Sequence, residues 1–339
     1  MSSNDTACKC PVCSSDDSEA FFSFQQAPTH IGILWPSREA ALGCKKGDIE
    51  LHFCKRCGHV FNPLFDENLL DYSEEYDNAL EFSAVFREYL DGVAKDLVAR
   101  YGIQGKHVVE VGCGKGDFLM RLAQAGGNTG AGFDVSYDGR QDEAAEKLGV
   151  KFFREFYTEK HKDQNPDVLC SRFVYEHIPD PIAFLRGIRE TLGDREDVVV
   201  YFEVPNMGLT LRQLSVWDVI YEHCAHFTAP SLEYAFRAAG FNVHRVDEKY
   251  NEQILAIEAS PAIGEVAESE TLAADVATIA GHVNTFKGGV GERFDTWKQE
   301  MENLQGSGKN AVLWGGGARG VSYLTMLGLD REIQCVVDI

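Results

Sequence analysis

The segment VVEVGCGKGDF, which covers residues 108–118, constrains the fold more than any other part of the sequence. Apolar residues surround an acid, Glu110, and lead into the alternate glycines Gly112, Gly114 and Gly116, after which a helical pattern begins. This order predicts a buried parallel strand, a glycine turn and the start of a helix. Because glycines have no Cβ atom, a ligand can approach the backbone closely at the helix N-terminus. The segment therefore predicts a binding loop, with a tight turn that holds no ligand as the alternative.

A second apolar run, GAGF, ends at Asp134. An acid at the tip of the second strand can accept hydrogen bonds from both hydroxyls of a ribose. The GxGxG form of the first loop resembles the cofactor loop of class I S-adenosylmethionine (SAM) methyltransferases and differs from the GxGxxG of dinucleotide-binding proteins. The residues expected to bind SAM lie in this loop, at the second strand and directly after a later strand: Glu110, Gly112, Cys113, Gly114, Asp134, Arg172 and Phe173.

The pattern of the whole sequence predicts three domains. A cysteine-bearing segment that is rich in turns covers residues 1–72. Residues 73–259 start with a helical pattern over 78–101, which Gly102 ends, and then alternate strand-like runs with helical ones. That alternation is the signature of a doubly wound α/β domain.

Residues 260–339 form the third segment. A small, acidic stretch predicts a linker over 260–270, and a helical pattern interrupted at Gly288 and Gly289 follows it. The closing run has the pattern of a strand, a glycine turn, a helix and a strand, as at the start of a Rossmann-like domain. Since a complete sheet needs more strands, we expect the sequence to be part of a longer protein.

The charge balance excludes one class of partner. With 32 basic against 53 acidic residues, the formal net charge of -21 repels phosphate backbones, so nucleic acids are not expected to bind. An anionic small molecule can still bind in a locally basic cleft.

The sequence starts without a signal peptide, and no apolar run approaches the roughly 20 residues that span a bilayer. Ten cysteines without an export signal predict a cytoplasmic protein with metal thiolates rather than disulfides.

Two CxxC pairs, Cys10 with Cys13 and Cys54 with Cys57, predict a metal site in the first segment. Two such turns can hold Zn²⁺ in a closed tetrahedral shell of thiolates, which leaves no position for a reacting water. A redox CxxC is the alternative, although the first pair does not lie between a strand and a helix as that chemistry prefers. Cys8 is a competing ligand. The other cysteines are expected to be small buried hydrophobic residues, and the nearby histidines to be surface or packing residues: Cys44, Cys113, Cys170, Cys224 and Cys335, and His30, His52 and His59.

Two segments that contain Glu-His are candidates for catalysis. His177 follows the strand DVLC, and loops at the carboxyl ends of parallel strands line the ligand crevice. A helix-entry residue held by local hydrogen bonds is the alternative for this histidine. The second segment places a phenol, a carboxylate and two imidazoles among apolar residues, where partial burial shifts the pKa of such groups. Its candidates are Tyr221, Glu222, His223 and His226, and a metal site is the rival interpretation of its two histidines.

Seven short segments follow one another in the chain: CPVC, CKRCG, VVEVGCGKGDF, EHIPDP, FEVPN, IYEHCAHFT and LWGGGARG. With these segments in this order, the chain resembles the SAM-dependent sugar C-methyltransferases of deoxysugar biosynthesis. The resemblance implies a zinc-binding N-terminal domain, a class I methyltransferase domain and a C-terminal Rossmann-like domain. It also implies a nucleoside-diphosphate keto-deoxysugar as substrate, methylated at a carbon beside the ketone. The alternatives are O- or N-methylation of another small natural-product intermediate, and a SAM-binding zinc scaffold without activity.

The resemblance assigns the catalytic base to the Glu-His pair, here Glu222 and His223. Removal of the proton beside the ketone leaves an enolate, which attacks the methyl group of SAM. We expect His223 to be the base and Glu222 to orient or polarise it. His177 and Tyr221 are expected to donate hydrogen bonds to the enolate oxygen, and His226 is the substitute for either. Members of the family have the sequence Tyr-His-Glu-His at this position, whereas this chain has Tyr221-Glu222-His223, which is one residue shorter. The role of Tyr221 therefore stays open.

The closing segment contains a second glycine pattern. Gly315, Gly317 and Gly320 form GxGxxG, with Asp338 at the end of the next strand. Taken alone the pattern suggests NAD, but a single match of this kind is weak. The resemblance implies a platform for a nucleotide sugar instead.

Overall fold

The computed structural model describes residues 8–31, 33, 35–70, 83–329 and 332–338. The chain divides into two compact units: unit 1 contains residues 1–71, 206–230 and 271–339, and unit 2 contains residues 72–205 and 231–270. The segment 206–230, which includes the second Glu-His pair, therefore belongs with the N-terminal and C-terminal parts of the chain and not with the α/β unit that surrounds it in sequence.

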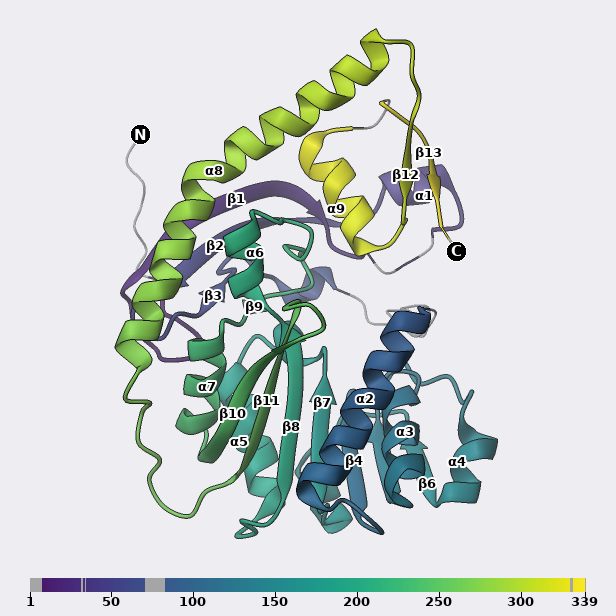
Figure 1. Ribbon diagram of the computed structural model, residues 1–339, viewed down its shortest axis with the longest axis vertical. Helices are drawn as coiled ribbons and strands as arrows, with labels where there is room; N and C mark the ends of the chain where they lie inside the picture. The colour runs from purple at the N-terminus through teal and green to yellow at the C-terminus, as the bar shows by residue number, and fades with distance from the viewer. Residues whose placement is uncertain (1–7, 32, 34, 71–82, 330–331, 339) are drawn as a thin grey trace. The chain divides into compact units, whose positions relative to one another are not determined.

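The described part of unit 2 is built around a sheet of seven strands with helices on both faces (Figure 1). In spatial order the strands are β10 (Phe241–Lys249), β11 (Ile254–Pro261), β8 (Val199–Pro205), β7 (Val168–Arg172), β4 (His107–Val111), β5 (Thr129–Phe133) and β6 (Val150–Phe153). The strands from β8 to β6 are parallel, whereas β11 and β10 are antiparallel to their neighbours. β4 has β5 on one side and β7 on the other, and ligands of open α/β sheets bind outside the carboxyl ends of the strands at such a switch point.

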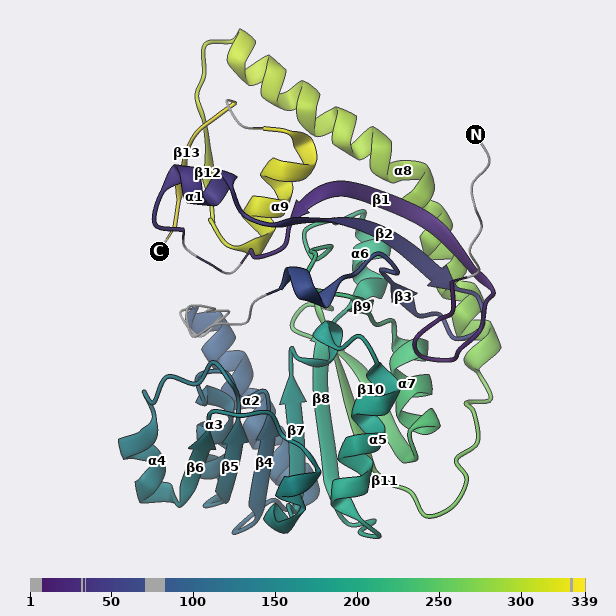
Figure 2. The same cartoon turned by 180° about the vertical axis from the view of Figure 1, so that it is seen from behind.

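Alternate residues of these strands face two helical layers. One face packs against α2 and α3, where Leu90 and Leu119 are fully buried. The opposite face, seen in Figure 2, packs against α5 and α7 through the edge-to-face rings of Phe184, Phe202 and Phe236. The helices of this unit are α2 (Ala84–Tyr101), α3 (Asp117–Gly126), α4 (Asp142–Leu148), η2 (Glu159–Gln164), η3 (Tyr175–His177), α5 (Pro181–Leu192) and α7 (Ala229–Ala238), of which α7 joins this unit from Ser231.

Local sequence signals set the ends of these helices. α2 begins after Ser83, whose side chain accepts a hydrogen bond from the third amide of the helix, and it ends at Gly102 in the left-handed conformation as predicted. The predicted start of this helix at residue 78 lies outside the described residues. α5 begins with Asp180 as N-cap and Pro181 at the first turn.

In unit 1, four of the described strands form an antiparallel sheet in the order β1 (Ser18–Pro28), β2 (Lys46–Cys54), β3 (Val60–Phe61) and β9 (Ala225–His226). β9 comes from the second Glu-His segment, and it places His226 opposite Val60 and Ala225 opposite Phe61. Backbone hydrogen bonds therefore join this segment to the N-terminal sheet. The other described elements of unit 1 are α1 (Arg38–Leu42), η1 (Glu67–Leu69), α6 (Met207–Gln213), α8 (Leu272–Gly306), α9 (Ala318–Leu327), β12 (Ala311–Trp314) and β13 (Ile333–Val337).

The helix α8 is 35 residues long and lies along β1 (Figures 1 and 2). Its buried positions recur every three or four residues, and Phe286 contacts the rings of two phenylalanines of β1. The helix is continuous through Gly288 and Gly289, so the predicted interruption is wrong. A glycine inside a helix costs about 1 kcal/mol, and burial of the long apolar stripe outweighs that cost.

The closing strand, glycine turn, helix and strand are confirmed as β12, α9 and β13, with the two strands parallel. The amide of Gly316 donates a hydrogen bond to the Asp338 carboxylate at 3.1 Å, which fixes the turn against the end of β13. None of the described helices combines the length and apolar character needed to cross a membrane.

Candidate functional site

The glycine loop follows β4 at the switch point of the sheet. Gly112 has φ 68, and a Cβ atom built there would lie 2.1 Å from Cγ2 of Val174. Val174 directly precedes η3, so the absence of a side chain at Gly112 lets the segment after β7 lie against the loop. Gly116 has φ 86 and forms the N-cap of α3 without a side chain to cap it. These backbone conformations favour glycine and explain the GxGxG spacing.

Glu110 replaces the missing cap of α3. The Glu110 side chain is 2% exposed and accepts a hydrogen bond from the amide of Leu119 at 3.0 Å. A carboxylate at a helix N-terminus is stabilised by the amides and by the helix dipole. Glu110 therefore orders the loop and the first turn of α3.

Asp134 follows β5 and lies beside the loop. Its Oδ2 accepts a hydrogen bond from the amide of Gly114 at 2.8 Å, and its Oδ1 accepts from the amide and the hydroxyl of Ser136, each at 2.7 Å. Lys115 donates to the backbone oxygen of Ser136 at 2.9 Å, which holds this turn in place. The half-buried carboxylate is thus fixed at the point where a ribose acceptor is expected.

We expect Asp134→Ala to weaken SAM binding more than tenfold, because a hydrogen bond to a charged acceptor contributes about 1.5–3 kcal/mol. Isothermal titration with SAM measures the change. Asp91→Ala is the matched control, since Asp91 is an exposed acid of α2 that pairs with Arg121 at 2.9 Å. Equal affinity of wild type and Asp134→Ala would remove Asp134 from the site.

Arg172 and Phe173 lie at the carboxyl end of β7. Nε of Arg172 donates to Glu203 of β8 at 2.6 Å, and the guanidinium stands 4.7 Å from the ring centroid of Phe118. Glu203 also accepts hydrogen bonds from the hydroxyls of Tyr89 and Tyr201, and burial and the Glu203 charge raise the pKa of Tyr89. Nη2 of Arg172 is buried without a hydrogen-bond partner among the described residues. The two N–H groups of Nη2 are therefore left for a ligand or a water.

The first Glu-His pair lies in η3. Tyr175 is fully buried and donates to the backbone oxygen of Pro181 at 3.1 Å, which ties η3 to the start of α5. The amide of His177 donates to the oxygen of Val174 at 3.0 Å, and its half-buried ring follows the carboxyl end of β7. The turn therefore holds His177 on the edge of the sheet where the glycine loop also lies.

The second Glu-His pair lies in a loop of unit 1 between α6 and β9. Glu222 is 2% exposed, and its Oε1 accepts a hydrogen bond from the amide of Ile31 at 3.1 Å. Nδ1 of His223 lies 3.1 Å from the backbone oxygen of Asp218. A carbonyl can only accept, so Nδ1 carries a hydrogen, and in the neutral ring the lone pair is then on Nε2. The Asp218 oxygen thus orients the ring, and the expected contact between Glu222 and His223 stays a prediction.

Tyr221 and His226 flank this pair. The Tyr221 hydroxyl accepts from the amide of Asp66 at 2.8 Å, and burial raises its pKa. A Cβ atom at Gly47 would lie 2.1 Å from the Tyr221 ring, so the glycine makes room for it. The ring of His226 is buried in β9 with its centroid 6.0 Å from that of His223. Tyr221 is therefore anchored by the N-terminal segment, and its predicted contact with substrate stays a prediction.

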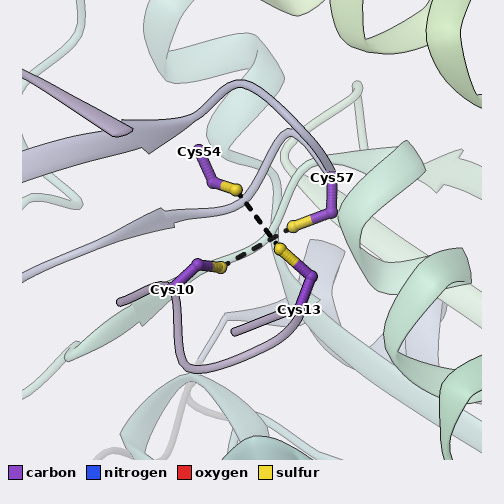
Figure 3. Close-up of side chains that lie close together, drawn as sticks. All are labelled: Cys10, Cys13, Cys54 and Cys57. Atoms are coloured by element: carbon purple, nitrogen blue, oxygen red, sulfur yellow. Dashed lines mark hydrogen bonds between the residues drawn. The ribbon is translucent and has the colours of Figure 1, made fainter. Parts of the chain in front are cut away.

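The thiols of Cys10, Cys13, Cys54 and Cys57 converge on one point (Figure 3). The four Sγ atoms lie within 4.8 Å of one another, with 3.7 Å between Cys10 and Cys57 and 3.4 Å between Cys13 and Cys54. Thiolates at about 2.3 Å from a tetrahedral zinc stand about 3.8 Å apart, so this donor set fits the ion.

Other cysteines and histidines lie outside the cluster. His59 is wholly buried between Phe61 and Phe227, and burial lowers its pKa to about 3, so the ring is neutral and packs as an apolar group. Cys113, Cys170 and Cys224 are buried as predicted. Two of the cysteines expected in the core are not buried: Cys44 is half-buried after the end of α1, and Cys335 is exposed on β13.

Sequence reasoning missed several residues of these sites. Glu203 stands inside the apolar run VVVYFEV, and a buried acid there was a usable sign that a cation such as Arg172 lies opposite. Ser136 binds the Asp134 carboxylate through its amide and its hydroxyl, and Asp218 binds the His223 ring through its backbone oxygen. No sequence pattern marks a backbone carbonyl as the partner of a histidine.

Residues 86–246 match the family model described as a methyltransferase domain. Ubiquinone biosynthesis O-methyltransferases are similar to part of the chain. The protein from Methylococcus capsulatus is 34% identical over 126 residues, which cover 35% of this chain and 52% of that protein. The protein from Aeromonas salmonicida is 32% identical over 94 residues, which cover 26% of this chain and 39% of that protein. The chain thus spans about half the length, or less, of these curated relatives.

Solved structures of methyltransferases are similar at lower identity. Magnesium protoporphyrin IX methyltransferase from Synechocystis PCC 6803 is 20% identical with a TM-score of 0.41, over 52% of this chain and 84% of that one. The 1,6-didemethyltoxoflavin-N1-methyltransferase from Burkholderia thailandensis is 17% identical with a TM-score of 0.41, over 60% of this chain and 96% of that one. Both of those structures contain S-adenosylhomocysteine.

Proposed function

We propose that this chain, in which residues 86–246 form a class I SAM-dependent methyltransferase domain, methylates a carbon atom beside a ketone in a nucleoside-diphosphate keto-deoxysugar. The observation that carries the proposal is the hydrogen bond from Nδ1 of His223 to the Asp218 oxygen, which in the neutral ring places the basic lone pair on Nε2. Carbon methylation needs such a base, because the substrate becomes nucleophilic only as its enolate.

Unit 2 supplies the residues that would hold SAM. Gly114 has φ 51 and open space where a Cβ atom would lie, as a close ligand requires, and Asp134 presents a fixed carboxylate to a ribose. The remaining donor of Arg172, Nη2, is proposed to serve the carboxylate of the cofactor. Bound SAM supplies a methyl group activated by its sulfonium.

Unit 1 supplies the base. Nε2 of His223 is proposed to take the proton beside the ketone, while the hydrogen bond from Nδ1 to the Asp218 oxygen stabilises the imidazolium that forms. His177 is proposed to donate to the enolate oxygen, with His226 as the substitute. Because Glu222 accepts from Ile31 and Tyr221 from Asp66, we propose that both hold the loop in shape.

Zinc is proposed as a structural ion held by the four clustered thiols. The closed shell of Cys10, Cys13, Cys54 and Cys57 leaves no ligand position for substrate. The cluster therefore serves the fold of unit 1 and takes no part in the reaction.

O-methylation of a small molecule is the second candidate function. The similarity to ubiquinone biosynthesis O-methyltransferases favours it, since those relatives are 34% and 32% identical over their matched regions. A single base also suffices for this reaction, and no enolate has to be stabilised.

Methyl-¹³C SAM separates the two functions. We expect incubation with thymidine diphosphate 4-keto-6-deoxysugars to place the label on a ring carbon, seen as a carbon-bound methyl in ¹³C spectra of the product. A label on oxygen would support the second candidate instead. SAM binding without turnover on either substrate class would favour a scaffold without activity.

A further inference from the structure

The loop that carries His223 is a succession of tight turns. α6 ends at Leu214 in the left-handed conformation, and the amide of Val219 donates to the oxygen of Val216 at 3.0 Å. The amide of His223 then donates to the oxygen of Ile220 at 3.2 Å. The Asp218 oxygen, which accepts from the His223 ring, belongs to the first of these turns. The orientation of the ring therefore depends on where the backbone at residues 217–218 is held.

Side chains of α8 and α9 hold that backbone. The ring of Trp217 contacts Trp297 of α8, with centroids 4.9 Å apart, and Tyr323 of α9 at 6.1 Å. Trp297 and Tyr323 also contact each other at 5.7 Å, so the three rings form one cluster. Nε of Arg319 lies 3.5 Å from Oδ1 of Asp218. Two adjacent residues of the loop are thus anchored from two helices.

α8 also approaches the start of the loop. A Cβ atom at Gly289 would lie 3.0 Å from Cδ1 of Leu214, so the glycine allows this contact. Gly289 and Trp297 are eight residues apart and lie on the same side of the helix. One face of α8 therefore lines the loop from Leu214 to Trp217.

We propose that α8 and α9 position the catalytic base: Trp297, Tyr323 and Arg319 fix residues 217–218 and, through the Asp218 oxygen, select the tautomer of His223 that leaves Nε2 free of hydrogen. The proposal rests on the proposed function, in which His223 takes the proton. These helices lie outside residues 86–246, so the device is separate from the matched methyltransferase domain. Trp297 carries more of the effect than Arg319, because an ion pair between exposed side chains contributes little.

The first test observes the tautomer without any substrate. Proteins labelled with ¹⁵N in histidine give separate signals for protonated and unprotonated ring nitrogens, and the His223→Gln spectrum identifies the residue. We expect the wild type to show Nδ1 protonated and Nε2 unprotonated. In Trp297→Ala both signals should move towards a common value, because the two tautomers then interconvert. Trp297→Phe should restore the wild-type pattern. Unchanged nitrogen signals in Trp297→Ala would overturn the proposal.

The second test measures proton exchange on thymidine diphosphate 4-keto-6-deoxyglucose in D₂O with S-adenosylhomocysteine present. We expect Trp297→Ala to slow the exchange about tenfold and Arg319→Ala to slow it less, with SAM affinity unchanged. In the His223→Ala background, where the residual rate of methyl transfer is measured instead, Trp297→Ala should have no further effect, since both changes act on the same group. A further decrease there would show a general structural role and contradict the proposal.

Controls separate this proposal from the proposed function. Arg245→Ala removes a surface ion pair with Asp247 in unit 2 and should leave both readouts unchanged. Exchange that is absent from the wild type, or that survives in His223→Ala, would refute the proposed function. The nitrogen signals of Trp297→Ala would still decide whether the helices position the ring.

Discussion

Replacement of His223 by alanine is expected to lower methyl transfer by about 10²- to 10⁴-fold, the usual contribution of a general base. The imidazole that accepts the proton is lost, and water has to replace it. SAM affinity should stay close to that of the wild type, because the residues proposed to bind SAM belong to unit 2 and His223 belongs to unit 1. Turnover with labelled SAM and isothermal titration measure the two quantities on the same preparation.

Proton exchange in D₂O tests the same assignment without methyl transfer. With S-adenosylhomocysteine in place of SAM, the wild type is expected to exchange the proton beside the ketone, and His223→Ala should lose this exchange. Glu222→Gln is the matched comparison, because its amide oxygen can still accept from Ile31, so its defect should be milder. Wild-type turnover in His223→Ala would contradict the assignment and direct the search to His177 and His226.

The sequence predicted those features of unit 2 that depend on local conformation. One short stretch contains three glycines with positive φ, an acid that caps α3 and an acid after β5. The local backbone conformation explains why each of these residue types occurs at its position. The strand β10 was missed, because it lies at the edge of the sheet and its exposed face carries polar residues, as in FNVHRVDEK. An edge strand with one solvated face lacks the apolar run that marks a central strand.

The partners of the second Glu-His pair could not be predicted from the sequence. Glu222 accepts from Ile31, which lies 191 residues away in the chain, and Tyr221 from Asp66, 155 residues away. Such pairings follow from the sheet that joins β9 to β3 and not from any local pattern. The same sheet explains why residues 206–230 belong to unit 1 although the sequence places them inside the α/β domain.

Removal of zinc is expected to unfold the sheet of unit 1 and to abolish turnover. A structural zinc binds small domains with about 10–16 kcal/mol, and this binding energy stabilises the folded state because the unfolded chain has no preformed site. Cys54 ends β2, and Cys57 precedes β3, which pairs with β9 of the catalytic loop. The hydroxyl of Thr228, just after β9, also donates to the oxygen of Gly58 at 2.9 Å. Loss of the metal is therefore expected to disturb the loop that contains His223, because backbone hydrogen bonds connect this loop to the zinc-binding strands.

Elemental analysis of the pure protein should find one zinc per chain, and Cys57→Ser should remove it. Limited proteolysis is then expected to cut the N-terminal segment, and the exchange reaction should stop. SAM binding should persist, because the core between α2, α3 and the sheet of unit 2 contains none of the four thiols. Loss of zinc and of proton exchange with SAM binding intact would locate the role of the metal in unit 1.

Cys8→Ser is the matched control, because Cys8 is a half-buried cysteine close to the first pair in sequence and is absent from the cluster of described ligands. This variant should keep its zinc, its resistance to protease and its turnover. Full zinc content in Cys57→Ser, or protein that contains no zinc and is still active, would contradict the metal site. Loss of zinc with intact proton exchange would keep the site but show that the loop of His223 folds without it.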